Sequence, residues 1–211
     1  MRIFLFVNFL LILVFIKPVH SFTGRSETKT PPDTIDQWKP VFDASFQKGL
    51  FRTTMDIRKN HLTGFIFIKK VSDTSYRILF SNEIGMKFFD LEFREHELIV
   101  HYCFPSMDSK SLLKLLHSDF RILFFSNNGI KKIALVKTEK ENEKIFKIKS
   151  EQGKWNYQIS TPTGKIFFIG SIKRFISKTR IKLDYSDGIT TGINISNPMI
   201  KLNISMNLIS P

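Results

Sequence analysis

The sequence predicts a mainly β protein of the α+β class: a curved antiparallel half-barrel of about 11 strands that wraps around a central helical plug and is preceded by a leading helix. Short apolar–polar alternations recur from residue 51 onwards, separated by short polar breaks, which is typical of strands joined by hairpins. One segment near residue 115 instead carries leucines at helical spacing. Because each strand must bury its apolar face, we expect that helix to fill the concave side of the sheet.

The N-terminus has the features of an export signal over residues 1–21. Arg2 supplies a positive charge, an apolar run covers 3–16, and cleavage is expected between Ser21 and Phe22. The run is shorter than the roughly 20 residues that a membrane-spanning helix needs. We therefore expect an exported protein in the periplasm or at the outer-membrane periphery, with an uncleaved membrane anchor as the alternative.

Residues 22–34 are polar and contain a Pro-Pro pair, which predicts a tether followed by a single domain over 35–211. The domain begins with apolar residues spaced by three and four, which predicts a short amphipathic helix from Asp36 to Gly49. Its buried face would consist of Trp38, Val41, Phe42, Ser45 and Phe46. A strand over Pro40–Phe46 is the alternative, because every second residue from 42 to 46 is also apolar.

A first meander follows, with five expected strands at Phe51–Arg58, Leu62–Val71, Ser75–Ser81, Met86–Arg94 and Leu98–Phe104. In the fourth strand, apolar residues 89, 91 and 93 alternate with charged residues 90, 92 and 94. Asp90 and Glu92 on one face invite comparison with a catalytic carboxylate pair. We interpret them instead as a solvated outer row that pairs with Lys69 or Arg77 across strands.

The central segment, from about Met107 to Phe125, is expected to be a helix that starts at Ser106 or Asp108. Its apolar face would consist of Leu112, Leu113, Leu116, Phe120 and Leu123. Strands then resume at Ile133–Thr138, Lys144–Glu151, Trp155–Ile159, Lys165–Ile172, Thr179–Asp184, Thr190–Ser196 and Ile200–Leu208.

The composition excludes several functional classes. A hydrophobic fraction of 42% excludes a chain disordered by composition, and a single cysteine excludes both an internal disulfide and a multi-cysteine zinc site. The net charge is +13, but export makes nucleic acid a poor partner. An anionic membrane surface fits the charge better, although the lysines could simply solvate the outer face of the sheet. We expect a monomer with no cofactor.

No catalytic constellation is visible in the sequence. His101 and Cys103 lie two apart on one expected strand and would share a face, but two ligands are too few for a metal site. His117 and Asp119 lie on a helix in an arrangement that cannot assemble a hydrolase triad. Residues 194–196 and 203–205 match glycosylation sequons, a pattern too common to indicate function. We therefore expect no catalytic residues, and an exported enzyme is the least favoured alternative.

The order of elements resembles the half-barrel of Lol-type outer-membrane lipoprotein carriers and receptors, over roughly residues 35–210. The central stretch is also similar to an uncharacterised family of Bacteroidota envelope proteins. The segments that carry this similarity are residues 62–65, 68–70, 76–78, 82–90 and 112–120. The resemblance implies a non-enzymatic protein that holds acyl chains in a hydrophobic cleft and has a role in lipoprotein localisation.

The chain departs from Lol-type receptors in lacking a lipid-bearing cysteine after the apolar run. Such receptors also present an exposed apolar loop, and residues 84–86 or 124–125 could serve as one. The cleft residues that we expect to contact lipid are Phe65, Phe67, Phe89, Leu91, Phe93, Leu112, Leu116 and Trp155. The alternative is an envelope structural or assembly factor with a filled core, in which these side chains are plain core and the partner is a protein.

Overall fold

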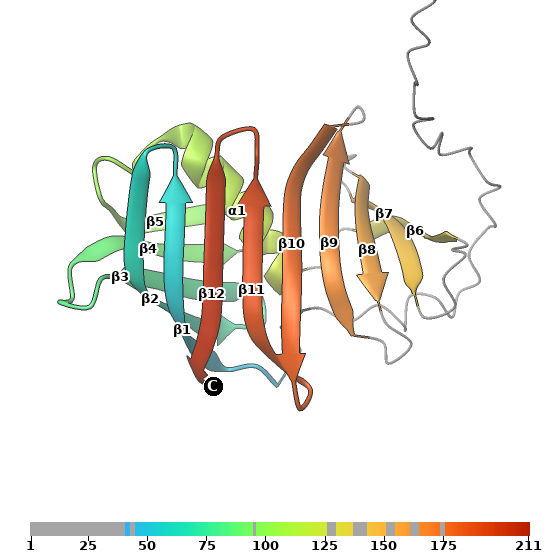
Figure 1. Ribbon diagram of the computed structural model, residues 1–211, viewed down its shortest axis with the longest axis horizontal. Helices are drawn as coiled ribbons and strands as arrows, with labels where there is room; N and C mark the ends of the chain where they lie inside the picture. The colour runs from blue at the N-terminus through green and yellow to red at the C-terminus, as the bar shows by residue number, and fades with distance from the viewer. Residues whose placement is uncertain are drawn as a thin grey trace, which may run out of the picture.

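The computed structural model describes residues 41–42, 45–94, 96–125, 130–136, 143–150, 155–160, 165–173 and 176–211. The expected export signal and tether lie outside these ranges. Within them the chain forms one antiparallel sheet of twelve strands and one helix, shown in Figure 1. The elements are β1 (Lys48–Ile57), β2 (Asn60–Ser72), β3 (Ser75–Ser81), β4 (Lys87–Arg94), β5 (Leu98–Cys103), α1 (Lys110–Phe124), β6 (Ile130–Val136), β7 (Lys144–Ser150), β8 (Trp155–Ser160), β9 (Ile166–Lys173), β10 (Ile176–Ser186), β11 (Ile189–Asn197) and β12 (Leu202–Ser210).

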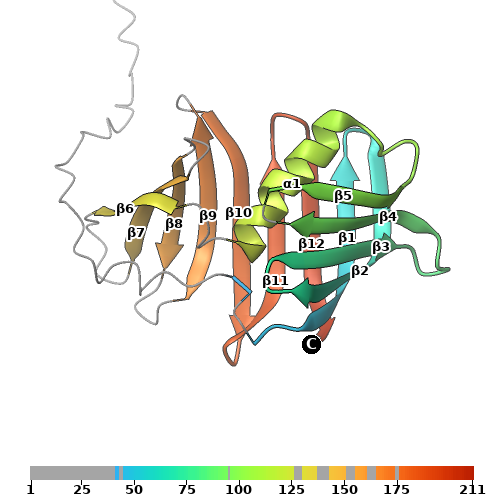
Figure 2. The same ribbon diagram turned by 180° about the vertical axis from the view of Figure 1, so that it is seen from behind.

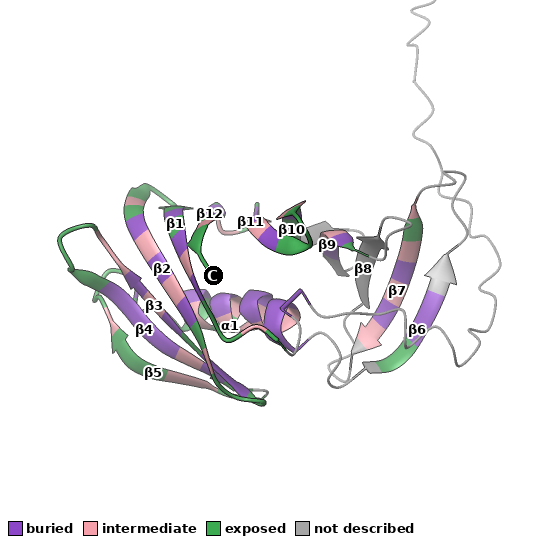
Figure 3. Ribbon diagram, turned by 90° about the horizontal axis from the view of Figure 1, so that it is seen from below, coloured by how far each residue is buried: buried purple, intermediate pink, exposed green. Residues whose placement is uncertain are grey.

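The sheet consists of two meanders, which are joined at the pairing of β1 and β12, the first and last strands along the chain. Its strand order is β5-β4-β3-β2-β1-β12-β11-β10-β9-β8-β7-β6, so β1 pairs with β12 at the centre and β5 and β6 form the two edges. The chain passes from one edge to the other through α1, which crosses the concave side of the sheet (Figures 2 and 3). The predicted fold class, a curved open antiparallel sheet wrapped around a helix, is confirmed.

Alternation along the strands determines which face is buried. In β1, Phe51, Met55 and Ile57 are buried. Residues 54 and 56, which point to the opposite face of the sheet, are exposed. Met55 lies opposite Leu62 on β2 and Ile204 on β12, so apolar side chains continue across neighbouring strands on the concave face. The period-two pattern therefore places the core inside the curve.

Helix α1 begins at the N-cap Ser109 and not at Ser106 or Asp108, the two predicted starting residues. The hydroxyl of Ser109 accepts a hydrogen bond of 3.4 Å from the backbone N–H of Leu112. The helix ends as the backbone N–H of Phe125 donates to the carbonyl of Arg121 at 2.8 Å. The buried apolar residues are spaced by three and four and consist of Leu112, Leu116, Phe120, Leu123 and Phe124.

The expected leading helix is not present at the positions that the structure describes. Val41 and Phe42 form a bend, Ser45 lies in a turn, and β1 already begins at Lys48. The alternative strand is also absent at these positions, and the rest of the predicted segment lies outside the described residues. The reason is packing: the Phe42 ring lies 5.5 Å from that of Phe124, so the apolar residues cover the end of α1.

Candidate functional site

The concave interior is an apolar core shared by the sheet and α1. Aromatic rings anchor the helix to β3 and β4: the ring of Phe93 lies 5.2 Å from that of Phe120, and the ring of Tyr76 stacks on that of Phe124 at 4.3 Å. On the opposite side, Ile181, Ile193 and other residues of β10–β12 belong to the same buried cluster. The helix therefore packs against both halves of the half-barrel.

Five of the eight predicted cleft residues meet in this interior. Phe89, Leu91 and Phe93 project from β4, and Leu112 and Leu116 project from α1. Their exposed fractions are between 0% and 3%, and all five belong to one buried cluster. The structure thus brings them together, with the helix occupying the space against the sheet.

Phe65 and Phe67 do not face this interior, which corrects their predicted orientation. Both are half-buried, whereas the next residue along the strand in each case, Ile66 and Ile68, is fully buried. Phe65 pairs with Arg52, whose guanidinium lies 5.9 Å from the centre of the Phe65 ring on the convex face. Strand β2 is apolar on both faces here, so alternation alone does not tell which set faces inward.

The eighth predicted residue, Trp155, begins β8, but its side chain lies outside the described part of the structure.

An apolar pocket that the sequence analysis missed lies at one end of the half-barrel. It has a volume of about 360 Å³, and its apolar lining comes from Val41, Phe42, Phe46, Phe51, Ile189 and Leu208. Three of these residues, Val41, Phe42 and Phe51, also belong to the buried core, so the pocket adjoins the interior. The pairing of β1 with β12 builds the pocket by bringing distant segments together, and that pairing leaves no local signal in the sequence.

Buried polar groups connect α1 to the far side of the sheet. The hydroxyl of Thr179 on β10 donates a hydrogen bond of 2.9 Å to Oδ1 of Asp119 on the helix. The side-chain amide of Asn197 on β11 donates to the same hydroxyl oxygen at 3.1 Å. All three residues are buried, so this chain of hydrogen bonds fixes the position of α1 against β10 and β11.

The outer face of β3 and β4 carries the predicted charged row, but the row is not solvated as expected, because Asp90 is buried with 5% of its surface exposed. Arg77 donates to both carboxylate oxygens of Asp90, at 2.7 and 2.9 Å, and this contact holds the pKa of Asp90 below its ordinary value. The predicted cross-strand pairing with Arg77 is therefore confirmed, and the carboxylates are engaged in ion pairs. This arrangement favours a structural role over acid–base chemistry.

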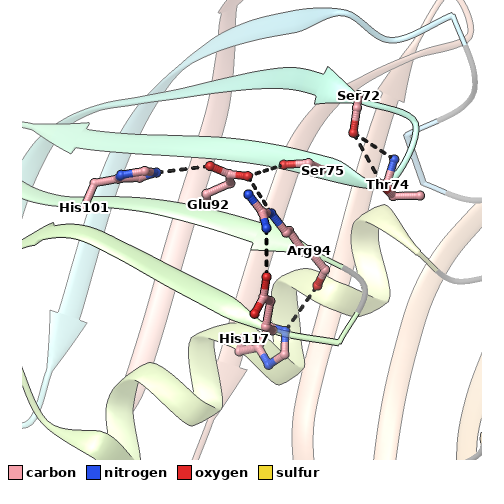
Figure 4. A network of polar contacts seen from close by, with 8 residues as sticks. Ser72, Thr74, Ser75, Glu92, Arg94, His101 and His117 are labelled. Carbon is pink, nitrogen blue, oxygen red and sulfur yellow. Dashed lines mark hydrogen bonds and ion pairs between the residues drawn. The ribbon is translucent and has the colours of Figure 1, made fainter.

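Glu92 is the centre of the network in Figure 4. Its carboxylate accepts hydrogen bonds of 2.9 Å from both Arg94 and Ser75, and its other oxygen lies 3.1 Å from Nε2 of His101. Chiefly through Arg94, with further help from Ser75 and His101, these contacts lower the pKa of Glu92 to about 2. The network ties β3, β4 and β5 together at the edge of the sheet.

His101 and Cys103 do not share a face, which corrects the prediction from their spacing. The register of β4 and β5 shifts between Asp90 and Leu91, opposite the segment that contains His101. As a result, the imidazole reaches Glu92, whereas Cys103 packs against the core and burial raises the pKa of its thiol. Within the described ranges, no group of three or more His, Cys, Asp or Glu side chains could hold a metal ion.

Acid should weaken the fold through Glu92. Its carboxylate has a lower pKa in the folded state than the ordinary 4.5, so its contribution to stability is present above pH 4.5 and is lost as the pH falls towards 2. Because solvent partly screens the site, we expect Glu92→Gln to remove about 1–2 kcal/mol at pH 7 and less at pH 3. Urea unfolding at the two pH values measures this, with the exposed Glu83→Gln as control. An equal loss at both pH values would contradict the assignment.

The part of the chain that the structure describes contains no helix long and apolar enough to cross a membrane.

Several solved structures are similar to this chain, and three of them are compared with it. A LolA superfamily protein from Nitrosomonas europaea has a TM-score of 0.57 and 6% identity, covering 77% of this chain and 83% of that chain. A DUF1329 family protein from Desulfovibrio piger has a TM-score of 0.46 and 11% identity, covering 83% and 87%.

The third structure is an outer membrane lipoprotein-sorting protein domain from Vibrio parahaemolyticus, with a TM-score of 0.48 and 9% identity over 80% of this chain and 86% of that chain. No protein-family model and no curated protein matches the sequence. The likeness therefore lies in the three-dimensional arrangement and concerns the fold alone. This chain has a Lol-type half-barrel fold, as the order of its elements predicts.

Proposed function

We propose that this protein is a non-enzymatic envelope protein that binds the acyl chain of a lipid or lipoprotein, with a role in lipoprotein localisation. The observation that carries the proposal is the apolar pocket of about 360 Å³ that adjoins the helix-filled interior. Its size lies in the range of ligand-binding pockets in proteins, and apolar side chains dominate such pockets.

The pocket is the proposed entrance. Ile189 at its rim is 51% exposed, whereas Phe51 in its wall is fully buried, so an acyl chain meets progressively drier surroundings as it enters. Each methylene group that leaves water contributes about 0.8 kcal/mol. A chain that extends beyond the pocket would insert between α1 and β4, where it would contact Phe89, Leu91, Phe93, Leu112 and Leu116. Those side chains are closed off now, so α1 must give up contacts to admit the chain.

The β3–β4 hairpin is the proposed contact with an anionic membrane. Ile84 at its tip is 90% exposed and Met86 is 45% exposed. The side-chain oxygen of Asn82 accepts hydrogen bonds from the backbone N–H of both residues, at 3.2 and 2.8 Å, and Gly85 supplies the positive φ of 86° that the turn requires. The hairpin therefore holds Ile84 away from the protein surface. Of the two loops considered from the sequence, this one fits, since Phe124 and Phe125 are buried.

Replacing Ile84 by aspartate is expected to weaken association with anionic vesicles at least tenfold, because one buried isoleucine contributes about 1.5–3 kcal/mol. Co-sedimentation with vesicles that contain phosphatidylglycerol measures the change. Met199→Asp is the matched control, since Met199 is a 62% exposed apolar residue in the turn before β12. If both variants lose vesicle association equally, the hairpin does not contact the membrane.

Native mass spectrometry tests the proposed function. The full chain, purified from its own envelope and then incubated with a palmitoylated peptide, is expected to carry one acylated molecule. Leu208→Asp in the pocket should abolish uptake, while Val71→Asp at a 54% exposed site should leave it unchanged. A ligand-free mass both before and after incubation would count against acyl binding.

A second candidate function is protein binding by a structural or assembly factor with a filled core. The observation that favours it is the near-zero exposure of Phe89, Leu91 and Phe93 under α1, together with the exposed apolar residues Val100 and Tyr102 on the edge strand β5. This candidate predicts no acyl uptake and, on partner binding, slower hydrogen exchange in β5. The mass-spectrometry experiment separates the two functions.

A further inference from the structure

The convex face of the central strands contains a second cavity, on the opposite side of the sheet from α1. Its volume is about 420 Å³, and it spans β1, β12, β11 and β10. The side chains of Ile195 and Ile204 point into the core, so only the backbone of these two residues lines the cavity. This cavity shares no lining residue with the apolar pocket, so a ligand bound here is independent of acyl-chain binding.

Two rows of polar side chains form the cavity. Strand register places Thr54, Ser205, Asn194 and Lys182 in one row across the four strands. It places Asp56, Asn203, Ser196 and Arg180 in the adjacent row. The middle of the cavity is thus lined by short hydroxyl and amide side chains, with cations at the β10 side and one carboxylate at the β1 side.

This choice of residues differs from an ordinary solvated sheet face. Asn is depleted in strands, yet two Asn and two Ser lie side by side near the ends of β11 and β12 that meet at the hairpin, next to long charged side chains. Short side chains flanked by long ones create the depression. The two sequon-like tripeptides, 194–196 and 203–205, supply these four residues.

We propose that this cavity binds an anionic saccharide, a sugar unit that carries a phosphate or carboxylate group. Arg180 and Lys182 would bind the anionic group, and amide and hydroxyl side chains would pair with the sugar hydroxyls, since both partners donate and accept hydrogen bonds. Oδ1 of Asp56 contacts Nδ1 of His61, so its other carboxylate oxygen would accept a hydrogen bond from a hydroxyl. A bare anion would gain nothing from that carboxylate, so the donor set favours a sugar over a free phosphate.

Isothermal titration of the full chain with glucose 1-phosphate, glucose and inorganic phosphate tests the proposal. We expect glucose 1-phosphate to bind at least tenfold more tightly than either glucose or phosphate. Lys182→Gln and Asn203→Val should each weaken its binding at least fivefold. Lys69→Gln, which removes an exposed lysine on β2 outside the cavity, should change nothing. Thermal unfolding of each variant confirms that it is folded.

The proposal is overturned if glucose 1-phosphate does not bind to the folded wild-type chain. Equal affinity for glucose 1-phosphate and inorganic phosphate would also overturn it, because the amide and hydroxyl side chains would then contribute nothing to the binding of the sugar. If neither cavity variant weakens the binding of glucose 1-phosphate, the ligand binds elsewhere, and the proposal is overturned as well. Acyl uptake in the mass-spectrometry experiment is expected to be unaffected by these variants, so the two sites are tested separately.

Discussion

Replacing Phe120 by alanine should lower the free energy of unfolding by about 3–5 kcal/mol, the usual loss when a buried aromatic side chain is truncated. Phe120 is fully buried at the centre of the contact between α1 and β4. Its ring lies 5.2 Å from that of Phe93 and 5.9 Å from that of Phe124. Truncation removes both contacts and leaves a cavity that the surrounding rings fill only in part.

Urea unfolding measures this loss. Lys114→Ala is the matched control, because Lys114 is exposed on the same helix, and it should change stability by no more than about 0.5 kcal/mol. A similarly small effect for Phe120→Ala would mean that α1 does not pack inside the sheet.

Replacing Thr179 by valine should be the second large effect. The substitution keeps the shape of the side chain but removes the hydroxyl that donates to Asp119 and accepts from Asn197. Hydrogen bonds to charged groups contribute about 1.5–3 kcal/mol, and a buried group that loses its partner adds a desolvation cost. We therefore expect a loss of about 2–3 kcal/mol. The helix should also detach from β10 more often and admit an acyl chain faster.

Thr191→Val is the control, since Thr191 is half-buried and lies on a neighbouring strand, β11. Chemical unfolding gives the stability, and stopped-flow fluorescence with a labelled fatty acid gives the rate of uptake. If Thr179→Val is as stable as the wild type, the hydrogen-bond chain does not hold the helix in place.

The strands and the helix could be predicted because their signals are local. Alternation along β4 and β12, and the spacing of Leu112, Leu116 and Phe120, depend only on neighbours in the sequence. The pairing of β1 with β12 joins segments about 150 residues apart and has no local signature. The apolar pocket depends on that pairing, so it could not be found from the sequence.

Orientation was harder to predict than the presence of a strand. In β2, residues 65–68 are all apolar, so the choice between Phe65 and Ile66 as the inward residue depends on the register with Phe51 on β1. At His101, one extra residue in β5 breaks the alternation. The segment at Val41 and Phe42 has helical spacing, but it covers the end of α1 as a bend. In each case a contact made in the folded protein decides the outcome.

In the proposed function, an acyl chain takes the space that α1 occupies against the sheet. Hydrogen exchange of the α1 amides, measured on the full chain with and without a palmitoylated peptide, tests this displacement. We expect bound peptide to accelerate exchange at Leu116, Asp119 and Phe120 at least tenfold, because the helix loses its contacts with the sheet. Unchanged or slower exchange in α1 while the peptide is bound would show that the acyl chain binds without displacing the helix, and the proposed binding mode would then be wrong.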